Sequence, residues 1–169
     1  MEFLKVLQER RSVRRFKPEA VPEESLQRIL EAARIAPSAG NLQAFKVFVA
    51  RSEEKRKELA DASFGQSFVA KAPIVLVFCA DLKASSRVYA ERGERLYALQ
   101  DASIAATFAM LAAVDEGLAS CWVGAFEDER VKKALETELQ PVAIFPIGFA
   151  DEKPRKARRK ELKELLKEV

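Results

Sequence analysis

The segment 37–43, which we call the amide loop, holds the side chains of this protein best suited to polar recognition. It contains Asn41, the only asparagine among 169 residues, together with Ser38 and Gln43. Amide side chains donate and accept hydrogen bonds at once, so they match the edge of a polar ring. Gly40 tolerates either sign of φ and lets another group approach the backbone closely. The alternative interpretation is an ordinary turn at the end of a helix, with Asn as a turn former.

Two basic segments could bind an anion. Residues 10–17, the arginine segment, carry five basic side chains and no acid; residues 153–160, the basic tail, carry six and no acid. The net charge is +3, so the residues outside the basic tail sum to −3. Guanidinium groups suit phosphate, although basic clusters also bind nucleic acids or membranes or simply form a solvated surface. Neither segment has the interleaved aromatics of a single-strand binder or a helix-turn-helix pattern around it.

Several kinds of chemistry are excluded by residue type. The chain has no histidine, which removes Ser-His triads and most zinc sites. Its six glycines form neither GxGxxG nor GxxxxGK, so Rossmann and P-loop nucleotide sites are unsupported. The carboxylates are scattered among helix-surface positions and predict no acid–base pair. If the protein is an enzyme, a cofactor must therefore supply the reactivity, with no catalytic side chain and no metal.

The elements that position these residues follow from hydrophobic periodicity. Apolar residues at 26, 29, 30 and 33 have helical spacing, and this helix begins after Pro22 and stops before Pro37. The continuous apolar run 74–80 predicts a buried central strand. An alanine-rich helix over 94–116, stopped by Gly117, could pack closely against a core helix or a second subunit. The other expected elements are helices over 3–9, 52–60, 128–138 and 159–168 and strands over 45–50, 120–123 and 142–148.

Length and composition predict one domain over residues 1–169 that buries about 70% of its unfolded surface. There is no run of 18 uncharged apolar residues, so we expect no membrane span. Residues 1–10 lack the apolar core of a signal peptide. Cys79 and Cys121 lie in separate apolar stretches without a CxxC motif, which predicts buried free thiols and a cytoplasmic protein.

Four segments in order give the chain a resemblance to a known family. They are Arg10-Arg11-Ser12-Val13-Arg14, Pro37-Ser38-Ala39-Gly40-Asn41-Leu42-Gln43, Gly117-Leu118-Ala119-Ser120-Cys121-Trp122-Val123-Gly124-Ala125-Phe126 and the basic tail. With this order and spacing the chain resembles the flavin-dependent nitroreductase family over nearly its whole length. The resemblance implies an α+β fold with a mixed, mostly antiparallel sheet flanked by helices. It also implies a homodimer that binds FMN at its interface, with residues 152–169 as a C-terminal arm exchanged between subunits.

The resemblance also implies which residues bind the cofactor. The arginine segment would hold the FMN phosphate and the pyrimidine edge, the amide loop of the partner subunit would contact the ring, backbone groups at Val123 and Gly124 would lie near flavin N5, and the tail would add phosphate contacts. The implied cofactor-binding residues are Arg10, Arg11, Ser12, Arg14, Pro37, Ser38, Asn41, Gln43, Gln66, Val123, Gly124, Lys156 and Arg158. Alternatively, Ser12 caps a turn, and we expect Trp122 only to fill the core.

By the same resemblance the protein is an NAD(P)H-dependent oxidoreductase of ping-pong type. NAD(P)H would transfer hydride to flavin N5 and leave, and an acceptor such as a nitroaromatic or quinone would enter the same cleft. The family's Pro-Trp after the loop glutamine is replaced by Ala44-Phe45, so the substrate-side wall is not predicted. The alternatives are reductive dehalogenation or flavin-consuming ring synthesis in the same family, or a small nucleic-acid-binding protein. Nothing in the sequence distinguishes NADH from NADPH.

Overall fold

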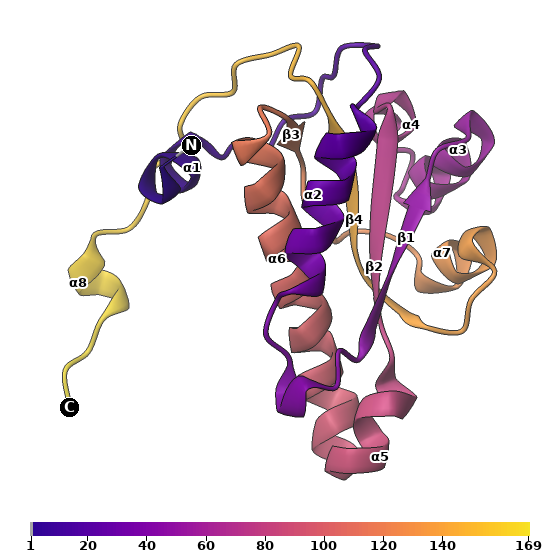
Figure 1. Cartoon of the computed structure of the whole chain (residues 1–169), viewed down its shortest axis with the longest axis vertical. Coiled ribbons are helices and arrows are strands. Elements are labelled where there is room, and N and C mark those ends of the chain that lie inside the picture. The colour runs from indigo at the N-terminus through magenta and orange to yellow at the C-terminus, as the bar shows by residue number, and fades with distance from the viewer. Residues whose placement is uncertain (1) are drawn as a thin grey trace.

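The computed structural model describes residues 2–169 and has the expected α+β architecture (Figure 1). Its elements in chain order are α1 (Phe3–Glu9), α2 (Glu23–Arg34), η1 (Ala39–Asn41), β1 (Phe45–Ala50), α3 (Glu53–Ala62), α4 (Ser67–Lys71), β2 (Ile74–Ala80), α5 (Leu82–Arg92), η2 (Gly93–Tyr97), α6 (Ala98–Asp115), β3 (Ala119–Ser120), α7 (Asp128–Leu135), β4 (Gln140–Gly148) and α8 (Leu162–Leu165).

A four-stranded sheet in the order β1-β2-β4-β3 forms the centre of the molecule, and each neighbouring pair of strands is antiparallel. The one parallel pairing in the described chain is an isolated bridge between Ser12 and Ser120. Every residue of β2 is buried, as its apolar run predicted. Val77 of this strand lies opposite Phe48 on β1 and Ile144 on β4.

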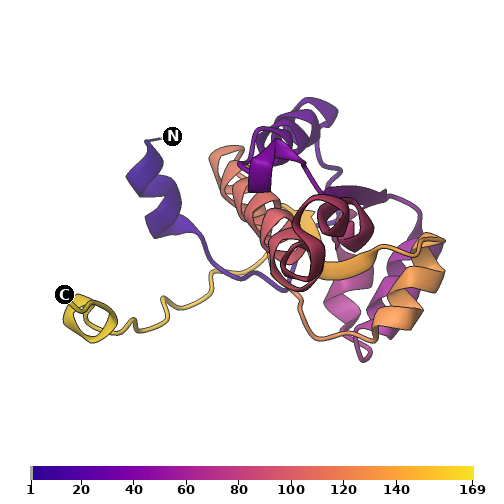
Figure 2. The same ribbon diagram turned by 90° about the horizontal axis from the view of Figure 1, so that it is seen from below.

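Helices cover both faces of the sheet (Figures 1 and 2). On one face, α2 and α6 pack against alternate β2 residues, among them Leu76 and Phe78. On the other face, α3, α4 and α7 pack against the intervening residues, including Val75 and Val77. Because side chains alternate along a strand, one apolar run serves two cores.

The expected helix over 94–116 is shorter than predicted and is preceded by a helix that the sequence did not reveal. The segment Leu82–Asp115 continues as α5, a π-helical turn η2 and α6, with non-helical backbone at Ala90 (φ 49°, ψ −139°). α5 is largely exposed and carries no clear apolar stripe, so periodicity could not predict it. The stop at Gly117 is confirmed: its φ is +74°, and Leu118 N–H closes the helix on Ala113 O.

The same segment Leu82–Asp115 is long and apolar enough to cross a membrane by length and composition alone. The apolar character comes from α6, whose buried alanines, such as Ala105 and Ala109, pack in the core with α2 and the sheet. A core helix passes the same length and hydropathy test, so this segment is weak evidence for a membrane span.

Three other predicted boundaries are corrected. The strand expected over 120–123 is only Ala119–Ser120, with Val123 forming an isolated bridge to Ile144. The helix expected over 128–138 ends at Leu135, because Glu136 turns left-handed at φ 53°. The C-terminal helix expected over 159–168 is a single turn, Leu162–Leu165, whose leucines are more than 60% exposed and therefore gain little from packing.

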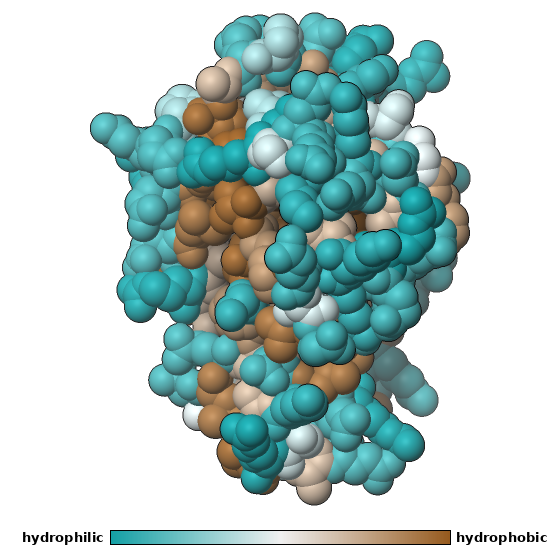
Figure 3. Space-filling view, turned by 90° about the vertical axis from the view of Figure 1, so that its right-hand side faces the viewer, coloured by the Kyte–Doolittle hydropathy of each residue, from teal (hydrophilic) through white to brown (hydrophobic). Residues whose placement is uncertain are grey.

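The C-terminal arm with α8 stands away from the body (Figure 2), whereas α1 contacts α6 and buries Val6. α1 and α8 expose large apolar side chains, including Phe3, Leu4, Leu162 and Leu165. On the side where β1 is the edge strand, apolar surface also forms a band along the molecule (Figure 3), and Val49 of β1 is 37% exposed. Apolar surface of this extent is typical of a chain that binds a partner.

Candidate functional site

The arginine segment is fixed by backbone pairing with β3 at one end and with Phe149, directly after β4, at the other. Val13 N–H donates to Ser120 O at 3.0 Å, and Lys17 N–H donates to Phe149 O at 2.9 Å. Val13 and Phe16 are buried by this pairing, whereas the guanidinium groups between them remain outside. The fold therefore presents the arginines on a rigid backbone.

The C-terminal arm is tied to the same segment by an acidic side chain. The Glu152 carboxylate accepts hydrogen bonds from the backbone N–H groups of Arg14 (2.6 Å) and Arg15 (3.1 Å). The Arg15 guanidinium in turn donates to Asp151 O at 2.8 Å. These contacts anchor the arm where the basic tail begins, so the tail starts beside the arginine segment.

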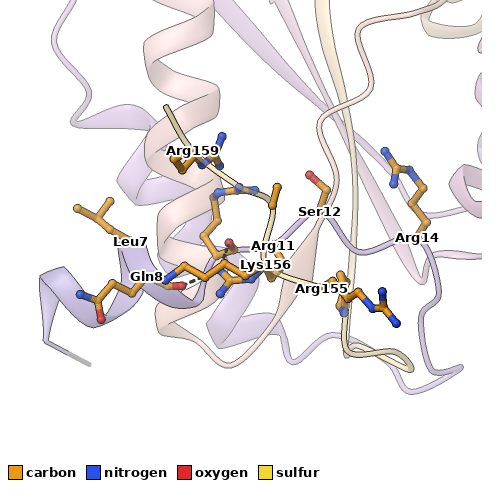
Figure 4. A pocket seen from close by; sticks show the side chains of 11 residues that line it. Leu7, Gln8, Arg11, Ser12, Arg14, Arg155, Lys156 and Arg159 are labelled. Atoms are coloured by element: carbon orange, nitrogen blue, oxygen red, sulfur yellow. Dashed lines mark hydrogen bonds between the residues drawn. The ribbon is translucent and has the colours of Figure 1, made fainter. Parts of the chain in front are cut away.

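A cavity of about 640 Å³ opens between α1, the arginine segment and the basic tail (Figure 4), and we call it the basic pocket. The residues that line it are Leu7, Gln8, Arg10, Arg11, Ser12, Arg14, Pro154, Arg155, Lys156, Ala157 and Arg159. Six of these side chains are basic, and none of the lining residues, all within the described chain, is acidic. Six cations around one cavity form a site for a multiply charged anion.

The electrostatics of the basic pocket differ from those of a solvated basic surface. Burial lowers the pKa of Arg10, and the positive charges of Arg159 and Arg11 lower it further. Arg11 is held by donating to Gln8 O (2.6 Å) and Arg10 O (2.7 Å). The fold thus holds the positive charges of Arg10, Arg11 and Arg159 close together, and a bound anion would reduce the repulsion between them.

Sequence reasoning identified part of this pocket. Arg10, Arg11, Ser12, Arg14 and Lys156 line it as expected, whereas Arg158 is exposed and is not among its lining residues. Arg155 and Arg159 line it and were not predicted. The tail at these positions has no regular secondary structure, so no periodicity indicates which of its basic residues face inward.

A second group of predicted residues meets at the end of α3. Gln66 donates to Ala125 O at 3.3 Å and to Ser63 O at 3.0 Å, which ties it to the segment after β3. Both backbone groups of Val123 are already paired with Ile144 at 3.0 Å. Gly124 is exposed, and within residues 2–169 its N–H has no protein partner, so it is the better donor to a ligand.

Two neighbours of this group are also placed. The Trp122 ring packs edge-on against Phe145 at 5.1 Å, but Trp122 is 37% exposed. The expectation that Trp122 only fills the core is therefore met in part. Cys121 lies buried beneath the arginine segment, where burial raises the pKa of its thiol. Cys79 is likewise a buried free thiol, as predicted.

The amide loop presents its polar side chains to the outside. Asn41 and Gln43 are exposed, and both have positive φ, 56° and 50°. Gln43 N–H donates to the Ser38 hydroxyl at 2.9 Å, and the Gln43 side-chain amide donates to Asn41 O at 3.1 Å. This internal bonding orders the loop without using all of its donors and acceptors, so it can still recognise a ligand.

One chain does not bring the amide loop to the basic pocket. The loop lies against the N-terminal end of α6, where Asp101 accepts a hydrogen bond from Ala39 N–H, whereas the arginine segment pairs with β3 just beyond the C-terminal end of α6 (Figure 1). α6 is 18 residues long, which corresponds to about 27 Å. The predicted residues are therefore divided between opposite ends of the long helix.

Metal chemistry finds no support in the described residues. Between residues 2 and 169, no three side chains of Asp, Glu, Cys or His lie close enough together to hold a metal ion. The basic pocket and the amide loop together offer cationic and hydrogen-bonding groups.

Comparison with known proteins identifies the family. The model of the nitroreductase family matches residues 7–73 and 63–149. The chain is 37% identical over 150 residues to the Archaeoglobus fulgidus protein named "Putative NADH dehydrogenase/NAD(P)H nitroreductase", covering 86% of this chain and 82% of the relative. This chain belongs to the nitroreductase family.

Solved structures agree with this assignment. A nitroreductase family protein from Streptococcus pneumoniae superposes with a TM-score of 0.89 at 25% identity, covering 99% of this chain and 100% of the other. An FMN-dependent nitroreductase from Clostridium difficile gives a TM-score of 0.79 at 29% identity, with coverage of 92% and 91%. The predicted α+β nitroreductase fold is therefore confirmed.

Proposed function

We propose that this protein is an FMN-dependent oxidoreductase that takes hydride from NAD(P)H and reduces a small acceptor such as a nitroaromatic or a quinone. The observation that carries the proposal is the basic pocket, where six basic side chains and no acid surround a cavity of about 640 Å³. Family membership and a similar structure named as FMN-dependent support the same cofactor.

The residues present fit the phosphate of FMN. Arg10 and Arg11 are held close together beside Lys156, and Figure 4 shows Arg11 and Lys156 converging while Ser12 and Arg14 extend the pocket away from α1. Guanidinium forks bind phosphate oxygens in pairs, and the Ser12 hydroxyl adds a neutral donor. We therefore assign these residues to the phosphate, with Arg155 and Arg159 joining them from the tail.

The remaining predicted residues would orient the flavin ring, with Gly124 N–H as a donor near N5 and Gln66 beside it. The bound flavin supplies the transfer of hydride from NAD(P)H to the acceptor. The protein supplies orientation and a positive environment that favours negative charge on the ring. The chain contains no histidine, so no imidazole can supply protons to the acceptor, and we propose that the protons come from water or from the substrate.

We further propose that the active form is a homodimer in which the amide loop of one subunit, with Pro37, Ser38, Asn41 and Gln43, contacts the flavin held by the other. The separation of the loop from the basic pocket along α6 supports this arrangement. An exposed apolar groove on α6 that includes Leu99, Ile104 and Phe108 supports it as well. The exposed leucines of the arm would then pack on the partner.

The protein is proposed to be cytoplasmic, in keeping with its two buried cysteines, which carry free thiols rather than a disulfide. We propose one domain over residues 1–169, with Arg158 of the arm contributing long-range attraction to the phosphate without lining the pocket.

The absorbance spectrum of the purified protein tests the proposal. We expect a yellow protein with a flavin spectrum that is bleached by NADH or NADPH in a stopped-flow mixer and restored by a nitroaromatic or quinone. A colourless protein with salt-sensitive binding to nucleic acid would overturn it. Reoxidation only by halogenated acceptors, or loss of the flavin during turnover, would point to the dehalogenase or ring-synthase alternatives.

A further inference from the structure

The backbone of the amide loop is left-handed at three positions, and it is strained at the two that carry a side chain, Asn41 and Gln43. Gly40, Asn41 and Gln43 all have φ between +50° and +56°, a conformation that side-chain-bearing residues rarely adopt. Such backbone persists only where the surrounding structure holds it in place. Two contacts from the α5–α6 segment hold this loop.

The first contact is made by Asp101, in the first turn of α6. Its side chain is 2% exposed, and Oδ1 accepts a hydrogen bond from Ala39 N–H at 2.9 Å. The other oxygen, Oδ2, is buried and has no hydrogen-bond partner within residues 2–169. A buried carboxylate that accepts a single hydrogen bond contributes little to stability, because the free-energy penalty of removing it from water exceeds the stabilisation by that hydrogen bond. Its presence is better explained by what it does to the loop.

The second contact closes over Gly40. The Tyr89 hydroxyl lies so close that a Cβ at position 40 would clash with it, and the nearest ring carbon would lie 3.4 Å away. Tyr89 is itself braced edge-on against Tyr97 at 5.1 Å. The helix that the sequence did not reveal, α5, therefore packs against the loop that was predicted to recognise a ligand.

We propose that Asp101 is a positioning residue for the flavin site: its carboxylate holds the amide loop in the left-handed conformation that directs Asn41 and Gln43 toward the flavin ring. Asp101 acts through Ala39 and touches neither cofactor nor substrate. The inference rests on the proposed function, in which the amide loop contacts the flavin ring and not the phosphate of FMN. It follows that Asp101 affects every flavin equally, with or without a phosphate.

Two flavins separate this role from the others. Titrating FMN and riboflavin into flavin-stripped protein, well below the thermal midpoint, measures the phosphate-dependent and ring-dependent parts of binding. In Asp101→Ala we expect both affinities to fall by the same factor, about tenfold, which is the scale of one lost hydrogen bond to a charged group. Asp101→Asn keeps an acceptor for Ala39 N–H and should restore both to within about threefold of the wild type.

The matched control is Ser86→Ala in the same α5–α6 segment, because the Ser86 hydroxyl donates to Lys83 O within α5, at 3.2 Å, and lies outside the α6 groove. We expect no change in either affinity. Gly40→Ala should reproduce the loss in Asp101→Ala, and adding Tyr89→Phe should recover part of it, since the nearest remaining atom is then at ordinary contact distance. This pair keeps the inference testable if Asp101→Ala does not fold.

The outcomes are distinct. Unchanged binding of both flavins in Asp101→Ala and Gly40→Ala would overturn the inference, as would a lowered thermal midpoint with unchanged affinities, which would mark Asp101 as structural only. A loss confined to FMN would also overturn it, because it would place the loop at the phosphate. Failure of the wild-type protein to bind either flavin would instead overturn the proposed function, and this inference with it.

Discussion

Removing Arg10 is the most direct test of the basic pocket. Arg10 is half-buried, and its pKa is lowered by burial and by the neighbouring charges of Arg159 and Arg11. The guanidinium charge is therefore destabilised in the free protein, and a bound phosphate would stabilise it. A hydrogen bond between charged groups contributes about 1.5–3 kcal/mol. Because this guanidinium is partly shielded from water, we expect Arg10→Ala to lose about 2–3 kcal/mol, or about 30- to 150-fold in FMN affinity.

The assay is a fluorescence titration of FMN into flavin-stripped protein at two salt concentrations. Removing one cation should also flatten the salt dependence of binding, since fewer charges face the phosphate. Lys17→Ala is the matched control: Lys17 belongs to the same segment, but its ammonium group pairs with Glu19 at 3.6 Å and does not line the pocket. Riboflavin, which lacks the phosphate, should bind Arg10→Ala and wild type alike.

Three results would refute this reasoning. The Arg10→Ala protein could purify with a full complement of flavin and an unchanged FMN affinity. It could lose riboflavin and FMN equally, which would mean that Arg10 acts on the ring or on folding. Lys17→Ala could weaken FMN as much as Arg10→Ala, which would mean that the pocket acts only as a diffuse surface charge.

Three further predictions concern the arm, the tail and acid stability. Deleting residues 152–169 is expected to loosen the dimer and strip the flavin, because the arm carries three exposed leucines and three basic side chains of the pocket; light scattering that reports an intact, flavin-loaded dimer would contradict this. Lys156→Ala should weaken FMN about tenfold, whereas Arg158→Ala should change it less than about threefold, and equal losses in titration would be inconsistent with the pocket. Arg28 holds the pKa of the Glu116 carboxyl below its ordinary value of 4.5, so this contact stabilises the fold above that pH and the contribution disappears as pH falls through the lowered value. Glu116→Gln should therefore be less stable than wild type near pH 7 by denaturant unfolding, with the difference shrinking in acid; a constant difference would exclude this linkage.

Elements with strong hydrophobic patterning could be predicted from the sequence. The buried run 74–80 is β2 residue for residue, and α2 lies between the prolines that were expected to bound it. Gly117 ends α6 because only a residue without a side chain takes positive φ readily at a helix end. The helix expected over 52–60 is α3, which Ser52 caps by accepting a hydrogen bond from Lys55 N–H. In each case the signal is local, so neighbouring residues suffice to define it.

Elements that are defined by long-range contacts could not be predicted from the sequence. α5 has no clear apolar stripe, and its place is set by packing against η2 and the amide loop. The C-terminal turn is shorter than the helix predicted over 159–168, because its leucines are left uncovered by residues 2–169. Periodicity predicts a face, but it does not say whether anything packs on it.

For the candidate site, residue types and order predicted the arginine segment, the amide loop and the tail as the recognition elements. The tertiary structure alone decided how they combine. Pairing of Val13 with Ser120 and the Glu152 anchor bring two segments more than a hundred residues apart to one cavity, and the irregular backbone of the tail selects Arg155 and Arg159 rather than Arg158. The length of α6 keeps the amide loop away from that cavity. The sequence determined which groups could bind an anion and a ring edge, because that chemistry belongs to the side chains; which of them meet depends on the path of the backbone, and only the fold determines that path.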